Sequence, residues 1–148
     1  GAINYMEDTA VPDPFARLRA LSEPGSVVDP ELLARLLESL PDAVLVADAN
    51  GVIQLVNAQC ELVFGYHRQE IVGKPVEMLV PVDVQARHVE HRRRFVVAPH
   101  VRQMGGGDSP LFGLHQSGER IALEIDLSPI VTPKGIFAVA IIRKRQRP

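Results

Sequence analysis

The residues best suited to chemistry are two histidines on a predicted helix, in the segment Arg87-His88-Val89-Glu90-His91. Histidines three residues apart share one face of a helix, as a two-histidine metal site requires. A third ligand does not follow at a clear spacing, although Glu90, His100 or His115 could approach in space. We therefore predict no metal site.

Other reactive groups are sparse. The single cysteine, Cys60, excludes an internal disulfide and a cysteine-cluster zinc site, and it suits a reducing cytoplasm. No Ser-His-Asp set or pair of carboxylates stands at a diagnostic spacing, and the glycines 105–107 precede Asp108 rather than a helix that opens with lysine. We predict that the chain is not an enzyme and that any catalysis belongs to an effector domain outside it.

Length and composition limit the remaining classes. The chain has 148 residues, which is one domain's worth, and its net charge of -2 gives no reason to expect nucleic acid as a partner. No apolar run of about 18 residues is present, so we expect no membrane span and a cytoplasmic location. Aromatic residues are only 5% of the chain and tryptophan is absent, so the core must be mainly aliphatic.

The first thirty residues are expected to lie outside the folded domain. Residues 1–5 resemble a vector scar with Met6 as the native start, which would make this the N-terminal domain of its parent protein. Residues 6–30 are a proline-containing leader, in which apolar residues recur at helical spacing from Phe15 to Leu21. We predict a partly helical leader that packs loosely on the domain or on a partner.

A helix and a β-hairpin follow the leader. Asp29-Pro30 has the composition of a helix start, and the leucines of segment 32–40 form one apolar face. The apolar segment 43–48, the turn Asn50-Gly51 and the segment 52–56 predict a hairpin. We expect a type I′ turn, which requires a positive φ at both central residues.

The rest of the chain predicts helices first and strands afterwards. We expect helices over 58–64, 67–71 and 83–97, a loop over 99–110, and strands over 111–116, 122–130 and 136–142. Two strands before the helices and three after them predict an α+β fold, with one five-stranded antiparallel sheet and short helices on one face. Such an arrangement leaves space for a small ligand between the layers.

Spaced motifs along this order resemble a PAS domain. They are Leu40-Pro41-Asp42-Ala43, Asn50-Gly51-Val52-Ile53, Phe64-Gly65-Tyr66, Glu70-Ile71-Val72-Gly73-Lys74-Pro75, Leu79-Val80-Pro81, Arg87-His88, Ser117-Gly118-Glu119 and Leu127-Ser128-Pro129-Ile130. We assign the sensor domain to residues 31–143 and the start of a linker to residues 144–148. The resemblance implies a sensory module, usually not an enzyme, that regulates an attached effector such as a kinase or phosphatase.

The resemblance also bears on cofactors. In light-sensing PAS domains a cysteine forms the flavin adduct; the matching position here is Val76, so we do not expect flavin photochemistry. The oxygen-sensing branch has an Arg-His pair whose histidine binds haem iron, and Arg87-His88 is similar to it. That branch also has an arginine on the distal wall, where glycines 105–107 stand here. Haem binding through His88 stays open as an alternative.

We favour an apolar or amphipathic ligand similar to a fatty acid, or an empty core, because the predicted strands are aliphatic. Arginines among residues 87–94 could hold a carboxylate head group at the mouth of such a cavity. The predicted binding residues are His88, Val44, Val46, Leu55, Leu62, Met78, Phe95, Leu123, Ile125 and Val139. A ligand-free dimerisation or docking module is the other alternative, with a homodimer formed through the N-terminal helices or the sheet and the chain's own C-terminal effector domain as partner.

Overall fold

The computed structural model describes residues 29–98, 100–105 and 111–145. The expected vector scar, almost all of the predicted leader and the end of the predicted linker therefore lie outside the described residues. The chain divides into two compact units, Gly1–Arg35 and Leu36–Pro148. Each unit is described by itself.

Helix α3 (Pro30–Ser39) begins where the sequence predicts. The Asp29 carboxylate accepts a hydrogen bond from the Glu31 N–H at 2.9 Å, which satisfies one of the free donors of the first turn. One turn later, Arg35 forms an ion pair with Glu31 at 3.0 Å. The helix begins in the first unit and its last four residues belong to the second.

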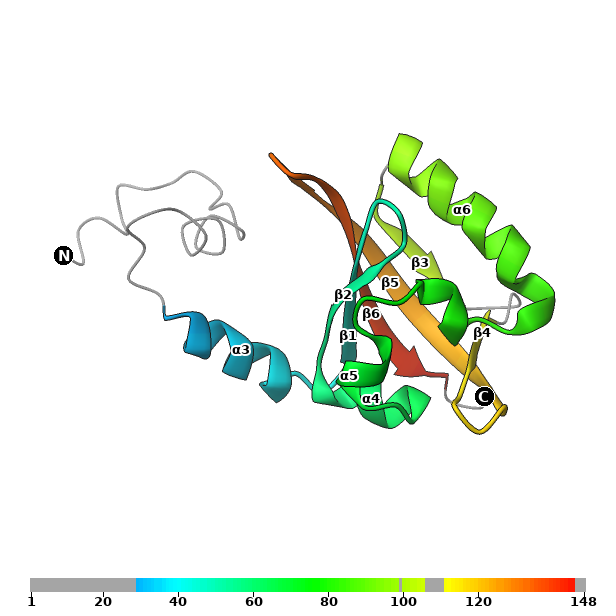
Figure 1. Cartoon of the computed structure of the whole chain (residues 1–148), viewed down its shortest axis with the longest axis horizontal. Coiled ribbons are helices and arrows are strands. Elements are labelled where there is room, and N and C mark those ends of the chain that lie inside the picture. Colours follow the sequence, from blue (N-terminus) through cyan, green and yellow to red (C-terminus); the bar gives the residue numbers. More distant parts are fainter. Residues whose placement is uncertain (1–28, 99, 106–110, 146–148) are drawn as a thin grey trace, which may run out of the picture. The chain divides into compact units, whose positions relative to one another are not determined.

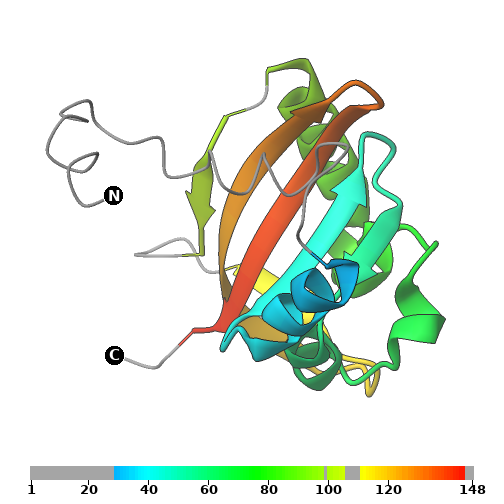
Figure 2. The same cartoon turned by 90° about the vertical axis from the view of Figure 1, so that its left-hand side faces the viewer.

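The second unit is built on one antiparallel sheet. Strands β1 (Ala43–Asp48), β2 (Ile53–Val56), β5 (Arg120–Thr132) and β6 (Gly135–Lys144) lie side by side in the order β2-β1-β6-β5 (Figure 2). The short strands β3 (Arg102–Met104) and β4 (Leu111–Leu114) both pair with β5 on the edge away from β6. The sheet therefore has six strands but is five strands wide.

The predicted α+β architecture is confirmed, with one strand more than expected. Strand β3 falls in segment 99–110, which the sequence predicts to be a loop. Its three residues are too few to show an alternating pattern, and it exists because the β5 backbone from Ile125 to Leu127 offers it partners. The long helix also starts later than expected, at Gln85, because a 3-10 turn precedes it.

The hairpin of β1 and β2 is confirmed, but its predicted turn type is wrong. Only Gly51 has a positive φ, of 79°, and Asn50 does not. The Asp48 carbonyl accepts from the Gly51 N–H, and the Asp48 carboxylate accepts from the N–H groups of Asn50 and Val52 at 2.9 Å each. Asp48 thus stabilises a longer turn in which glycine alone adopts the left-handed conformation.

All the helices of the second unit that follow β2 cover one face of the sheet (Figure 1). They are α4 (Ala58–Phe64), α5 (Arg68–Ile71), the 3-10 turns η1 (Val76–Leu79) and η2 (Val82–Val84), and α6 (Gln85–Val97). Helix α4 is capped at its start by the Asn57 side chain, and Gly65, with a φ of 78°, ends it. Because the opposite face of the sheet receives none of these helices, the sheet has a covered inner face and an outer face.

The Asn57 side chain connects three segments of the second unit by hydrogen bonds. Its side chain is completely buried and makes four hydrogen bonds. The Oδ1 atom accepts from the N–H groups of Val44 at 2.9 Å and Cys60 at 3.1 Å, and the Nδ2 atom donates to the carbonyls of Leu37 and Asp42 at 3.0 Å each. The end of α3, the start of β1 and the start of α4 are therefore held by one amide.

A partly exposed ion-pair cluster reinforces the same junction. Arg68 at the start of α5 lies 2.8 Å from Glu38 in α3 and 2.8 Å from Glu61 in α4. These contacts hold the pKa of both glutamates below its ordinary value, with the Arg68 hydrogen bond as the main cause in each case. The last turn of α3 is thus tied to the domain by two independent sets of polar contacts.

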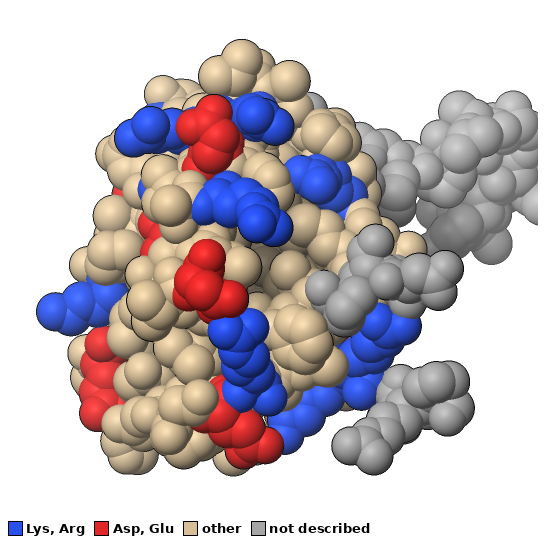
Figure 3. All heavy atoms as spheres, turned by 90° about the vertical axis from the view of Figure 1, so that its right-hand side faces the viewer, with Lys and Arg blue, Asp and Glu red and all other residues tan. Residues whose placement is uncertain are grey.

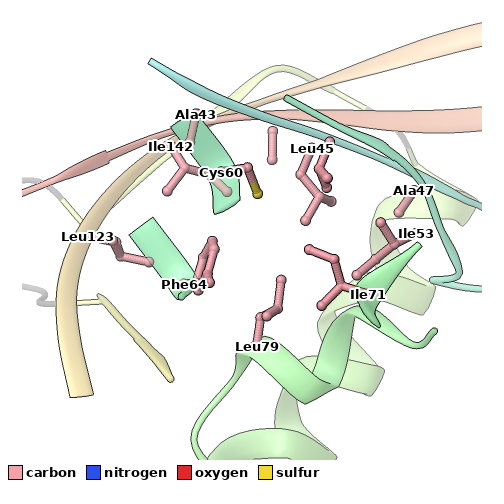
Figure 4. Packing of buried hydrophobic residues seen from close by; sticks show 12 residues of the cluster. Ala43, Leu45, Ala47, Ile53, Cys60, Phe64, Ile71, Leu79, Leu123 and Ile142 are labelled. Atoms are coloured by element: carbon pink, nitrogen blue, oxygen red, sulfur yellow. The ribbon is translucent and has the colours of Figure 1, made fainter. Parts of the chain in front are cut away.

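The core lies between the inner face of the sheet and α4, α5 and η1 (Figure 4). Its buried members are small or aliphatic apart from one aromatic ring: Ala43, Leu45, Ala47, Ile53, Val56, Cys60, Phe64, Ile71, Leu79, Leu123, Ala140 and Ile142. This composition agrees with the predicted aliphatic core. The part of the inner face beneath α6 is less filled, and the candidate site lies there.

Candidate functional site

A cavity of about 340 Å³ lies between the inner face of the sheet and helix α6, with η1 and η2 along one side. Strands β1, β5 and β6 provide its floor through side chains that alternate along each strand. These floor residues are Leu45 and Ala47 of β1, Leu123, Ile125 and Leu127 of β5, and Ile136, Ala138, Ala140 and Ile142 of β6. The volume falls in the lower part of the range of about 300–1,000 Å³ that is usual for ligand sites.

Four of the ten predicted binding residues line this cavity. His88 and Phe95 reach it from α6, and Leu123 and Ile125 reach it from β5. Phe95 is almost completely buried, while the His88 side chain is 36% exposed. The structure therefore brings together one imidazole, one aromatic ring and two aliphatic side chains from the predicted set.

The other strand residues of the predicted set do not line the cavity. Val46 is paired with both Leu55 and Val139, and these three side chains lie on the outer face. Val44, two residues before Val46 on β1, lies on the same outer face and is buried there. The reason is the two-residue period of a strand, which sends Leu45 and Ala47 inward and their neighbours outward.

The two remaining predicted residues lie elsewhere. Leu62 on α4 is 70% exposed and borders a separate, shallower groove beside the end of β6. Met78 on η1 is partly buried and packs against the hydrophobic core rather than into the cavity. Neither residue is positioned to contact a molecule bound under α6.

The edge strands add cavity residues that the sequence analysis missed. Arg102 and Met104 of β3 and Leu111 and Gly113 of β4 all line the cavity. Phe64 packs so closely over Gly113 that a side chain there would overlap the Phe64 ring and Leu123. For Arg102 and Met104, the alternation around Gln103 is the only sequence signal, and it is too short to identify a strand. Leu111 and Gly113 lie in a segment that the sequence predicts to be a strand, but nothing local shows that this strand borders the cavity.

A polar network closes one side of the cavity. Glu77 on η1 accepts hydrogen bonds from Arg92 Nε and Nη2, at 3.2 Å each, and its Oε2 atom lies 2.7 Å from His88 Nδ1. The Glu77 side chain is only 13% exposed, so a carboxylate there needs these partners. The Arg92 guanidinium also lies directly against Gly51 of the hairpin. The Glu77 carboxylate therefore joins η1 to α6, and Arg92 brings α6 into contact with the β1–β2 turn.

The cysteine has no place in the site. Cys60 is completely buried in α4, and burial raises the pKa of its thiol to about 12. A protonated, inaccessible thiol behaves as a small apolar side chain. Among the described residues, no group of three or more histidine, cysteine or acidic side chains could hold a metal ion.

Charges of both signs are mixed on the surface near α6. Figure 3 shows lysine and arginine side chains interspersed with aspartate and glutamate down this face. Two of the contacts are Arg94 with Glu90 within α6, and Arg120 of β5 with Asp83 of η2. Within the described segments, no helix is long and apolar enough to cross a membrane.

The layer order and sheet topology agree with one known family. The model of the PAS fold matches residues 31–145 of this chain. The chain belongs to the PAS family. This confirms the resemblance seen in the sequence motifs.

Solved PAS domains have the same fold. The PAS domain of an HTR-like protein from Haloarcula marismortui has a TM-score of 0.65 and 22% identity, covering 78% of this chain and 90% of that one. A PAS domain from a two-component sensor histidine kinase has a TM-score of 0.63 and 16% identity, covering 78% of this chain and 95% of that one. At these identities the likeness concerns the fold alone.

Two curated relatives are sensor proteins. The sensor protein FixL of Bradyrhizobium diazoefficiens is 35% identical over 75 residues, which is 49% of this chain. The oxygen sensor protein DosP of Escherichia coli is 25% identical over 130 residues, which is 83% of this chain. The matched segments span only 15% of the length of each relative. The chain is therefore a sensory PAS domain of the kind found in signalling proteins, and such domains are regulatory modules.

Proposed function

We propose that this PAS domain binds a small apolar or amphipathic molecule under α6 and thereby regulates a signalling effector, such as a kinase or phosphatase, attached to its C-terminal side. The observation that carries the proposal is the cavity of about 340 Å³, whose floor is aliphatic on all three central strands. Such a floor favours a hydrocarbon group over a nucleobase, because it offers few partners for polar atoms.

The position of the cavity supports a regulatory role. Strand β6 contributes four side chains to the floor and ends at Lys144, close to the C-terminal end of the described chain. Strand β5 pairs with β6 along ten residue pairs. A ligand that fills the cavity contacts both strands, so a shift of β5 or β6 caused by the ligand extends to the C-terminal end of β6. In this proposal the chain itself is not an enzyme, and its location is cytoplasmic.

Mass spectrometry of the native protein tests the proposal. The purified protein is extracted with organic solvent and the extract is analysed for acyl chains, and the melting temperature is then measured with and without added dodecanoate. A ligand that binds only the folded state stabilises it and so raises the melting temperature. At a ligand concentration of one hundred times the dissociation constant, the free energy of unfolding rises by about 2.7 kcal/mol. An empty extract together with an unchanged melting temperature would refute ligand binding of this kind and leave a ligand-free docking module.

A second candidate is a haem-based gas or redox sensor, and one observation favours it. A histidine that binds a metal through one ring nitrogen usually engages a carboxylate or carbonyl through the other. His88 lines the cavity and presents its Nδ1 atom to Glu77, so the geometry fits an iron ligand that uses Nε2. One relative is named an oxygen sensor protein. A bound haem would supply an iron at which a diatomic gas binds.

Absorption spectroscopy tests this candidate. Haemin is added to the protein, and a Soret band shifted from that of free haemin is expected if His88 is a ligand. His88→Ala should abolish the shift, whereas His91→Ala, one turn along the same helix, should retain it. An unshifted band removes the haem candidate and leaves the acyl ligand untouched.

A homodimer is the partner that the outer face of the sheet supports. Val46, Leu55 and Val139 form an apolar patch there, and no helix after β2 covers that face. Light scattering of the full chain, of a variant lacking residues 1–28 and of Val139→Arg distinguishes the two predicted interfaces. Loss of the dimer only on deletion assigns it to the N-terminal segment, and loss only in Val139→Arg assigns it to the sheet.

A further inference from the structure

Helix α6 presents two rows of side chains to the cavity, each with a spacing of four residues. The first row contains His88 and Arg92, and the second contains Arg87, His91 and Phe95. Residues four apart on a helix lie one above the other, so the two rows run side by side along α6. Their polar members differ in one respect, which is whether a carboxylate lies within reach.

The side chains of the first row already have a carboxylate partner. Glu77 contacts both His88 and Arg92 at hydrogen-bond distance, so the Arg92 guanidinium has its counter-ion and is fixed against the hairpin. An anionic ligand at Arg92 would have to compete with the Glu77 carboxylate, whose side chain is only 13% exposed. Arg92 is therefore a structural residue and not the ligand's anchor.

The second row has no such partner. Among the described residues, no carboxylate lies within ion-pair distance of Arg87 or His91, and both side chains are exposed at the cavity rim. Arg102 enters the cavity from β3, opposite the apolar side chain of Leu127 in the register. Within the described segments it too has no carboxylate at ion-pair distance. Arg102 is only half-buried, but it borders the aliphatic floor. A guanidinium in that position is stabilised when an anion joins it.

We infer that the ligand is an amphipathic monocarboxylic acid whose carboxylate is bound by Arg102, with Arg87 and His91 at the rim and the hydrocarbon chain on the floor of β5 and β6. This inference rests on the proposed ligand-binding function and names its ligand class. The planar guanidinium matches a carboxylate with two parallel hydrogen bonds. A monoanion suits the single half-buried charge better than a dianionic phosphate, which would bring a second charge against aliphatic walls.

Calorimetric titration with dodecanoate and with dodecanol tests the inference. The wild-type protein should bind the acid about tenfold or more tightly than the alcohol, since a hydrogen bond to a charged group exceeds a neutral one by that factor. Arg102→Met should reduce affinity for the acid about tenfold or more and change that for the alcohol less than threefold. Arg94→Gln is the matched control, because Arg94 is exposed on α6 and does not line the cavity.

The outcomes separate this inference from the proposed function. Equal binding of acid and alcohol by the wild type overturns the carboxylate site and leaves the apolar cavity as the ligand site. Binding of neither compound overturns both proposals. If Arg102→Met does not fold, as shown by circular dichroism, the wild-type preference for acid over alcohol and its decrease with added salt still decide the question. Tighter binding of dodecyl phosphate than of dodecanoate would also refute the monocarboxylate.

Discussion

Replacing Asn57 by alanine is expected to destabilise the domain by about 3–6 kcal/mol, a large fraction of the 5–15 kcal/mol that is usual for a domain. The substitution leaves the Val44 N–H without its acceptor in a buried position and removes the donor to the carbonyls of Leu37 and Asp42. An unsatisfied buried donor costs about 1–3 kcal/mol, loss of the helix cap of α4 adds about 1 kcal/mol, and each of the two lost hydrogen bonds to a carbonyl adds about 0.5–1 kcal/mol.

Urea denaturation followed by far-ultraviolet circular dichroism measures this effect, because the chain has no tryptophan for a fluorescence readout. With a slope of about 2 kcal/mol per molar urea, the midpoint should fall by about 2 M. Gln69→Ala, at an exposed position of the neighbouring helix α5, is the control and should shift the midpoint by less than about 0.3 M, since surface substitutions change stability by about 0.5 kcal/mol or less. A shift for Asn57→Ala as small as that of the control would refute the view that this amide fastens the three segments.

Three further predictions concern groups around this junction and the turns. Cys60 should resist thiol reagents in the folded protein at mildly alkaline pH and react fully in urea, because its pKa is raised to about 12 by burial; rapid labelling of the native protein would contradict its placement. Arg68→Gln should lower stability by about 1 kcal/mol at neutral pH. The pKa values of its two glutamate partners are lowered, so the stabilisation they give is present above the ordinary value of 4.5 and is lost as the pH falls through the lower folded-state pKa. The urea midpoints of the wild type and of Arg68→Gln should therefore converge in acid, and a difference that stays constant with pH would disprove the linkage. Gly51→Ala should cost more than Gly118→Ala, because both residues have a positive φ but only the first would overlap a neighbouring side chain; equal urea midpoints would argue against that contact.

The layer order could be predicted from the sequence, because each element carries its own local signal. Asp29 marks the start of α3, Asn57 and Gly65 mark the two ends of α4, and glycine marks each hairpin turn. Those signals depend on capping and on positive φ, which act within a few residues. The edge strand β3 has no local signal, since its pairing partner is more than twenty residues away along the chain.

The faces of the strands could be predicted only where polar residues alternate with apolar ones. On β5, Glu124 and Asp126 separate the aliphatic residues, and the prediction placed Leu123 and Ile125 where the cavity is found. On β1 the segment Ala43–Ala47 is apolar throughout, because both faces are at least partly covered. Its phase is set by pairing with β2 and β6, and the sequence of β1 alone carries no information about which side chains point inward.

The absence of a side chain at Gly113 has a consequence for selectivity. Phe64 and Leu123 occupy the space that a β-carbon at this position would need, and all three residues line the cavity. One methyl group on β4 would push the Phe64 ring or Leu123 aside, and larger residues would displace them further. A larger residue at position 113 would therefore change the shape of the cavity through Phe64 and Leu123, so this one position of β4 offers a way to alter which ligands fit.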